Sequence, residues 1–180
     1  MTIKLRLMII LIIGLFSLSA CGQIKKKESN KFNSVDTAKI SKPQGWVNDF
    51  EKVFDEEQKK TLENLISNFE KETSIEICII TVDTSMTSSK NFDDYVLEIG
   101  RQWGVGKREK NNGIVIGFSK SYRKIRISNG YGIEKLISDS ETKLVMDEYF
   151  IKNFKQNKYY EGTFQGTMAM MNLLRTKIKK

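Results

Sequence analysis

The sequence of 180 residues contains no histidine, and this absence removes several classes of chemistry at once. Ser-His-Asp and Cys-His catalysis need an imidazole, and so do histidine phosphorelays and histidine-based zinc or iron centres. One proline and 12 glycines exclude collagen-like and proline-rich architectures. Two cysteines cannot build the framework of a disulfide-rich mini-protein. Any chemistry must therefore rest on carboxylates, amides, hydroxyls, Lys, Arg or a bound metal ion.

The net charge of +8 lies mainly outside the part of the chain that we expect to fold. The first 21 residues contribute +2, residues 22–45 contribute +4 and residues 175–180 contribute +4, so residues 46–174 carry −2. A folded part without basic excess does not suit the phosphate backbone of a nucleic acid. Nucleic acid is therefore not expected as a partner.

The first twenty residues have the pattern of a bacterial signal peptide. Lys4 and Arg6 precede an apolar run over 7–18, which is shorter than the ~20 residues of a comfortable membrane span. The run ends in Leu-Ser-Ala-Cys, which resembles the lipobox after which cleavage exposes Cys21 for acylation with palmitate or similar chains. An uncleaved anchor or an ordinary signal peptide is the alternative. We expect a lipoprotein of the bacterial cell envelope, held on a membrane by several acyl chains, with its domain outside the cytoplasm.

Four segments follow from composition and periodicity. Residues 1–20 are the expected signal peptide, and residues 21–45 are the lipidated cysteine with a flexible polar tether. One domain is expected over 46–174, followed by a basic tail over 175–180. The lysines on either side of the domain suit membrane headgroups or plain solvation.

Apolar periodicity and capping residues predict the elements of this domain. We expect helices at about 55–69, 92–103, 138–154 and 159–174, and strands at 75–82, 113–119 and 124–128. The short link over 120–123 predicts an antiparallel hairpin. Gly162 and Gly166 give the last helix a smooth face on which a neighbour can lie closely, and the inner stripe of that helix includes Met168. This order of helices and strands predicts an α/β or α+β class, with a mixed sheet between two helical layers.

Cys78 lies in the apolar segment over 75–82, where no histidine can activate it. We expect a small buried hydrophobic residue rather than a nucleophile.

Three loops carry short oxygen-bearing side chains, at 46–49, 104–113 and 129–139. Such oxygens suit a hard cation such as Ca²⁺ or Mg²⁺, which a chain without histidine can still bind. Taken one at a time, each loop is better interpreted as an ordinary turn or helix cap.

Together and in this order, the loops resemble the TPM domain family from about Val47 to Leu174. The resemblance consists of an opening Val-x-Asp, a Trp-Gly-x-Gly segment, Asn-Gly before an apolar strand, an Arg-Ile strand ending in Gly-x-Gly-Ile-Glu, a following aspartate and a late Phe-Tyr pair. The positions are Val47, Asp49, Trp103, Gly104, Gly106, Asn112, Gly113, Arg126, Ile127, Gly130, Gly132, Ile133, Glu134, Asp139, Phe154 and Tyr159.

The resemblance implies a three-layer α/β/α sandwich in an exported or membrane-tethered bacterial protein, with relatives in the plant thylakoid lumen. Some members bind calcium or other divalent ions, and a thylakoid member is described as an acid phosphatase. By position, the implied metal ligands here are Asp49, Asn112 and Asp139, with Glu134 nearby. The family commonly has Asp-Asn-Gly where this chain has Asn111, Asn112 and Gly113, a change that removes one negative charge and weakens cation binding.

Two functions remain open at this stage. One is a divalent-metal-dependent phosphatase, in which Lys107, Arg108 or Arg126 would neutralise the phosphate. The other, which the anchor, the tether and the lack of a recognisable phosphatase motif favour, is an envelope module that binds an ion, preferably Ca²⁺, and an envelope protein.

Overall fold

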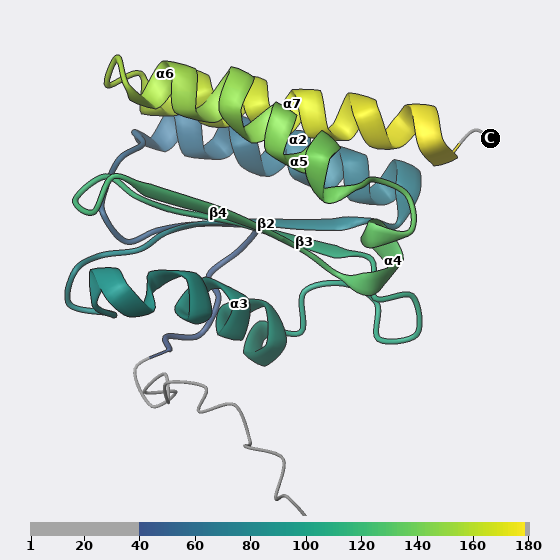
Figure 1. Cartoon of the computed structure of the whole chain (residues 1–180), viewed down its shortest axis with the longest axis horizontal. Coiled ribbons are helices and arrows are strands. Elements are labelled where there is room, and N and C mark those ends of the chain that lie inside the picture. The colour runs from purple at the N-terminus through teal and green to yellow at the C-terminus, as the bar shows by residue number, and fades with distance from the viewer. Residues whose placement is uncertain (1–39, 179–180) are drawn as a thin grey trace, which may run out of the picture. The chain divides into compact units, whose positions relative to one another are not determined.

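A computed structural model describes residues 40–178, which form a three-layer α/β/α sandwich (Figure 1). Its mixed sheet has four strands in the order β1-β2-β3-β4, of which the first three are parallel and β4 is antiparallel to β3. The strands are β1 (Val47–Asp49), β2 (Glu76–Thr81), β3 (Gly113–Ser119) and β4 (Lys124–Asn129). The predicted hairpin and the predicted fold class are confirmed.

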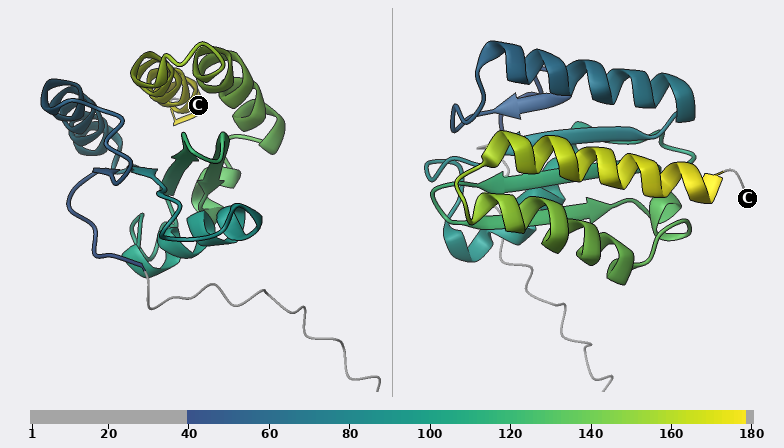
Figure 2. Two further views of the ribbon diagram at one scale, coloured as in Figure 1. Left: turned by 90° about the vertical axis from the view of Figure 1, so that its left-hand side faces the viewer. Right: turned by 90° about the horizontal axis from the view of Figure 1, so that it is seen from above.

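Helices cover both faces of this sheet. One face carries α3 (Phe92–Trp103), and the other carries α2 (Glu56–Thr73), α5 (Asp139–Val145), α6 (Lys152–Phe154) and α7 (Tyr159–Ile178). On that second face α7 lies between α2 and the α5–α6 pair (Figure 2). A single helical turn, α4 (Tyr131–Glu134), follows β4 where the sequence indicated only a glycine loop.

Both predicted capping boxes are present, and they determine where two helices begin. The Asp55 side chain accepts a hydrogen bond from the Gln58 amide, and the Gln58 side chain accepts one from the Asp55 amide. Ser138 and Glu141 repeat the arrangement at α5. Each box satisfies two amide groups that a helix start leaves without partners.

Strand β1 was not predicted, because Val47–Asp49 is too short to show an alternating pattern. Tertiary pairing makes it a strand: Val47 lies opposite Ile79 in parallel register, and the Ile79 amide donates to the Trp46 carbonyl at 2.8 Å. The chain makes contacts with the domain before this strand. Ile40 packs against the α3 side of the core, and the Trp103 indole donates to the Ser41 carbonyl at 2.8 Å.

The hydrophobic core lies on both faces of the two inner strands. Every residue of β3 and all of β2 except Glu76 are buried, as the apolar segments predicted. Cys78 is buried among them, and burial raises the pKa of its thiol to about 12. The expected burial of Cys78 is confirmed, and a raised pKa disfavours the thiolate form that a nucleophilic cysteine needs.

The last two helical segments pack more closely than ordinary side chains would allow. A Cβ at Gly166 would lie 2.1 Å from the Phe150 ring, and one at Gly162 would lie 2.8 Å from the Phe154 ring. The helix predicted over 138–154 is present, but Met146–Ile151 within it is π-helical. Met168 is 37% exposed, so its place on the inner face of α7 was wrongly predicted, and Met170 is buried instead.

No helix within residues 40–178 has the length and apolarity needed to cross a bilayer.

Candidate functional site

Asp49 lies where β1 ends, and both oxygens of its carboxylate are engaged. Oδ1 accepts hydrogen bonds from the Thr81 hydroxyl at 2.7 Å and the Val53 amide at 3.0 Å, while Oδ2 accepts one from the Phe54 amide at 2.8 Å. These bonds hold the turn between β1 and α2 against the end of β2. The geometry gives Asp49 a structural role.

Glu51 completes a network at the same end of the sheet. Its carboxylate accepts hydrogen bonds from the Ser119 hydroxyl at 3.0 Å, the Lys120 amide at 2.6 Å and the Ser121 amide at 3.1 Å. The end where β1, β2 and β3 finish, with Asp49, Thr81 and Ser119, is called the carboxyl end of the sheet below. Its two carboxylates are bound by the protein's own donors.

Asn112 precedes β3 and therefore lies at the opposite end of the sheet. Its Oδ1 accepts from the Lys107 amide at 2.8 Å, and its Nδ2 donates to the Ser74 carbonyl at 2.6 Å. The side chain is buried and joins the loop after α3 to the end of α2. Both ends of this amide group are thus used in holding loops together.

Lys107 was expected to be able to neutralise phosphate, but its ammonium group has other partners. It forms ion pairs with Glu70, at 3.0 Å, and with Glu76. Hydrogen bonds to these two carboxylates raise the pKa of Lys107. Glu76 also binds the loop after α3 directly, because its carboxylate accepts a hydrogen bond from the Gly106 backbone amide at 2.7 Å.

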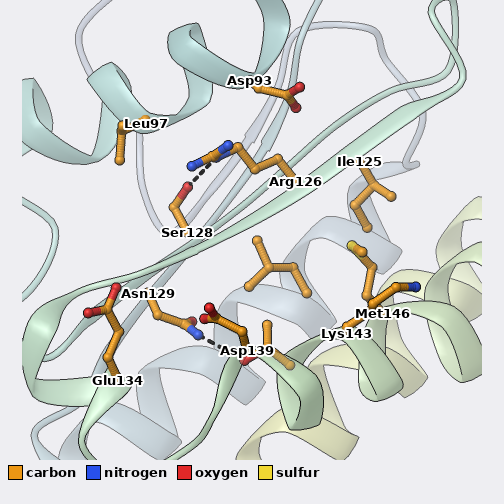
Figure 3. A pocket seen from close by; sticks show the side chains of 12 residues that line it. Asp93, Leu97, Ile125, Arg126, Ser128, Asn129, Glu134, Asp139, Lys143 and Met146 are labelled. Carbon is orange, nitrogen blue, oxygen red and sulfur yellow. Dashed lines mark hydrogen bonds between the residues drawn. The ribbon is translucent and has the colours of Figure 1, made fainter.

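Glu134 and Asp139 line a pocket of about 600 Å³ along the outer edge of β4 (Figure 3). This volume lies within the range of small-molecule pockets. We call it the edge pocket. It is lined by Asp93, Leu97, Ile125, Arg126, Ile127, Ser128, Asn129, Glu134, Asp139, Thr142, Lys143 and Met146.

Asn129 adds an oxygen to the edge pocket that sequence reasoning did not single out. Its Nδ2 donates to the Thr142 hydroxyl at 2.9 Å, whereas its Oδ1 is buried and has no hydrogen-bond partner. Buried polar atoms are rarely left unpaired, and each such atom calls for an explanation. Asn129 stands in the third oxygen-rich loop, so its position gave a signal, but nothing distinguished it from a turn residue.

The charges of the edge pocket are mixed. The Arg126 guanidinium donates to Ser128 Oγ at 2.9 Å, and Lys143 is paired with Asp147 one turn further along the chain. No side chain within residues 40–178 forms a hydrogen bond or an ion pair with Asp93, Glu134 or Asp139. The pocket is therefore lined by three carboxylates without counterions, the guanidinium of Arg126 and the ammonium of Lys143, which is paired with Asp147.

The four expected metal ligands do not form one site. Asp49 is level with Thr81 on β2, whereas Asn112 precedes Gly113, which is level with Glu76. Glu76 and Thr81 are five residue steps apart along β2, so these levels are about 16 Å apart. Among residues 40–178 no three His, Cys, Asp or Glu side chains gather as metal ligands. Of the four, Glu134 and Asp139 both line the edge pocket, where the Asn129 amide oxygen is the third oxygen of the kind that Ca²⁺ binds.

Comparison with solved structures identifies the same fold elsewhere. The N-terminal domain of a Porphyromonas gingivalis protein matches with a TM-score of 0.67 at 23% identity, over 74% of this chain and 84% of that one. The BA42 protein of Bizionia argentinensis matches with a TM-score of 0.62 at 21% identity, over 71% and 86%. The N-terminal domain of the cg2496 protein of Corynebacterium glutamicum matches with a TM-score of 0.54 at 12% identity, over 77% and 85%. At these identities the likeness concerns the fold alone.

Sequence comparison gives the family. No curated protein matches the chain. The model of the TPM domain, named TPM_phosphatase, matches residues 47–173, which is more than half of the chain. The opening Val-x-Asp, now seen as β1, and the glycine loop after β4 fall within this match. The chain belongs to the TPM domain family.

Proposed function

We propose that this protein is a divalent-cation-binding module of the bacterial cell envelope, and that Asn129, Glu134 and Asp139 supply its ligands. The observation that carries the proposal is the buried, unpartnered Oδ1 of Asn129 in the pocket that also holds the unpaired carboxylates of Glu134 and Asp139. A cation would give that oxygen a partner and would offset the charge of both carboxylates.

Calcium suits this arrangement better than magnesium. Ca²⁺ accepts six to eight oxygen ligands in a flexible geometry, so three protein oxygens can be supplemented by water. Mg²⁺ demands a near-ideal octahedron and releases water reluctantly. Asp49 and Asn112 are outside this proposed site, because their polar atoms already hold the fold. Their contribution is to the scaffold.

Calorimetric titration of the protein with CaCl₂ and with MgCl₂ tests the site. We expect saturable calcium binding that is lost in a Glu134→Gln, Asp139→Asn double variant, which keeps the shape of both side chains and removes both charges. Glu161→Gln is the matched control, because Glu161 is an exposed acid on α7 away from the pocket. Calcium binding that survives in the double variant would refute the assignment.

We further propose that Cys21 carries the lipid that holds the module on its membrane. The support is the Leu-Ser-Ala-Cys pattern after the apolar run, which lies outside the described residues. Labelled palmitate supplied to an expressing bacterium is expected to enter the wild-type protein and to be absent from Cys21→Ser. Equal label in both proteins would refute lipidation at this cysteine.

Phosphatase activity is the second candidate, and Arg126 is the observation that favours it. This guanidinium lies in the same pocket as Glu134 and Asp139, so a phosphate could meet both a cation bound by the acids and an arginine. Release of phosphate from para-nitrophenyl phosphate with Ca²⁺, Mg²⁺ or Mn²⁺ is the test. Activity abolished by Arg126→Gln would support this candidate, and no release with any of the three ions would reject it.

A further inference from the structure

The outer edge of β4 is open along most of its length. The Gly130 amide donates to the Gly113 carbonyl, and Ser128 lies opposite Val115 in the antiparallel register. In such a ladder every second residue pairs inward, so the backbone groups of Ile125, Ile127 and Asn129 point away from the sheet. Within residues 40–178, no hydrogen-bond partner is present for the backbone N–H and C=O groups of these three residues.

The opposite edge of the sheet, at β1, is protected against pairing with a further strand, so the two edges of the sheet differ. Strand β1 has only three residues. Glu63 accepts hydrogen bonds from the Trp46 and Val47 amides, at 3.1 and 2.8 Å. Short strands and blocked edge groups are common protections against unwanted strand pairing. The β4 edge has neither of them.

The edge pocket runs along this open strand and is bounded by a helix on each side. Five consecutive residues, 125–129, line it, together with Leu97 from α3 and Met146 from the helix that follows α5 (Figure 3). Five residues of strand extend over about 13 Å. A second copy that paired through its own β4 would bring its own α3 and α5 toward these helices, whereas a single extended segment has no flanking helices. The shape therefore favours a peptide.

The chemistry of the pocket indicates which peptide. Ile125 and Ile127 pack on the side of α5 and α7, whereas Arg126 and Ser128 lie on the α3 side. An added strand would therefore place apolar side chains on the first side and polar ones on the second, at every second position. Two unpaired carboxylates, Glu134 and Asp139, lie at the Asn129 end and favour a basic residue there.

We propose that β4 binds an extended segment of another protein as a fifth strand, antiparallel to β4, with a basic N-terminal end beside Glu134 and Asp139. The antiparallel direction is the commoner pairing. This peptide site shares Glu134 and Asp139 with the proposed cation site, so a basic residue and a cation would compete there. It does not depend on the cation site, because the unpaired backbone groups of Ile125 and Ile127 are present without a cation.

The probe is a synthetic peptide of about eight residues, two lysines followed by alternating valine and threonine, labelled with a fluorophore. Its anisotropy is measured with the full-length protein in detergent, in EDTA so that no cation occupies the acidic end. Two N-methylated versions of the peptide are compared. One is methylated at the amides of its odd-numbered residues and the other at the amides of its even-numbered residues. We expect one version to bind like the parent and the other to bind at least tenfold more weakly, because only one set faces β4.

Protein variants locate the same contact. Ile127→Pro removes an outward amide without breaking a bond to β3, and Ile127→Val keeps that amide and the branched shape. We expect at least tenfold weaker binding for the first and little change for the second. Hydrogen exchange in the presence of the peptide is expected to slow over 124–130. A peptide with its lysines at the other end is expected to bind more weakly.

Several results would overturn the proposal. These are no binding of the parent peptide, equal binding of both N-methylated versions, or protection away from β4. Protection of β4 without peptide that depends on protein concentration would make a second copy the occupant. Protection that disappears when residues 22–39 are deleted would make the chain's own tether the occupant. The N-methylated pair remains decisive even if Ile127→Pro does not fold.

Discussion

Asp49 and Asp139 are both aspartates beside the sheet, yet the protein uses them in opposite ways. Asp49, at the carboxyl end, accepts three hydrogen bonds from the turn and from Thr81. Asp139, in the edge pocket, stands in the first turn of α5, and the structure gives it no described side-chain partner. A carboxylate whose oxygens are all used by the fold contributes to stability. A carboxylate without partners is the one available to a ligand.

The largest effect should come from breaking the carboxyl end. Asp49→Ala leaves two amides and the Thr81 hydroxyl without their acceptor, and we expect a loss of about 2–4 kcal/mol in the free energy of unfolding. Asp139→Ala should cost under about 1 kcal/mol, the usual size of a helix-dipole interaction. Urea unfolding of both variants measures the difference. Equal losses would show that the two aspartates do not differ as the contacts indicate.

Asn112→Asp should cost less, about 1–3 kcal/mol. The new carboxylate could still accept from the Lys107 amide, but it would face the Ser74 carbonyl at the place where Asn112 Nδ2 donates. If Asn112 is a scaffold residue, calcium affinity should remain close to that of the wild type, whereas a metal ligand would bind calcium more tightly as an aspartate. Urea unfolding and calcium calorimetry together separate the two roles.

Asn111→Asp restores the acid that the family commonly has at this position, and it should raise the calcium affinity of the edge pocket. Asn111 is exposed, with a φ of 47°, and lines a second hollow that also contains Glu134. One more charge near the site is expected to contribute about 1 kcal/mol, or roughly fivefold in calcium affinity. Asn111→Ser is the neutral control. An unchanged dissociation constant would place residue 111 outside the site.

Replacing Glu141 should have the smallest effect, a change in how the melting temperature depends on pH. Hydrogen bonds from Lys177 and Ser138 hold its pKa at about 2, below the ordinary value of 4.5. A lowered pKa means that the carboxylate stabilises the fold at pH values above about 4.5, and that this contribution disappears as the pH falls toward 2. The melting temperature of Glu141→Gln should therefore be below that of the wild type at pH 7 and equal to it near pH 2. Glu148→Gln, an exposed acid, should show no such convergence.

The sequence predicted most of this fold because its signals are local. Capping boxes at Asp55 and Ser138 and the apolar segments of the inner strands can all be recognised within ten residues. Strand β1 has no local signal, since only its pairing with β2 makes it a strand. The π-helical segment likewise has no local signal, and it contains Phe150, whose ring packs on Gly166 of α7.

The site was predicted only in part for a related reason. Family resemblance brought together Asp49, Asn112, Glu134 and Asp139, but a motif does not indicate which oxygens the fold already uses. Only the three-dimensional structure shows that the polar atoms of Asp49 and Asn112 are hydrogen-bonded within the fold and that Asn129 Oδ1 has no partner. Ligation of a metal by Glu134 and Asp139 remains a prediction.

The position of β1 has a consequence for how the molecule bears tension. The chain enters the domain at Ile40 and passes directly into β1, at one edge of the sheet, whereas the open strand β4 forms the other edge. Strands β2 and β3, buried on both faces, separate the two edges. A pull on the N-terminal side is therefore borne first by β1 and by the Ser41 contact with Trp103. The β4 edge, two buried strands away, should feel such a pull only after β1 has given way.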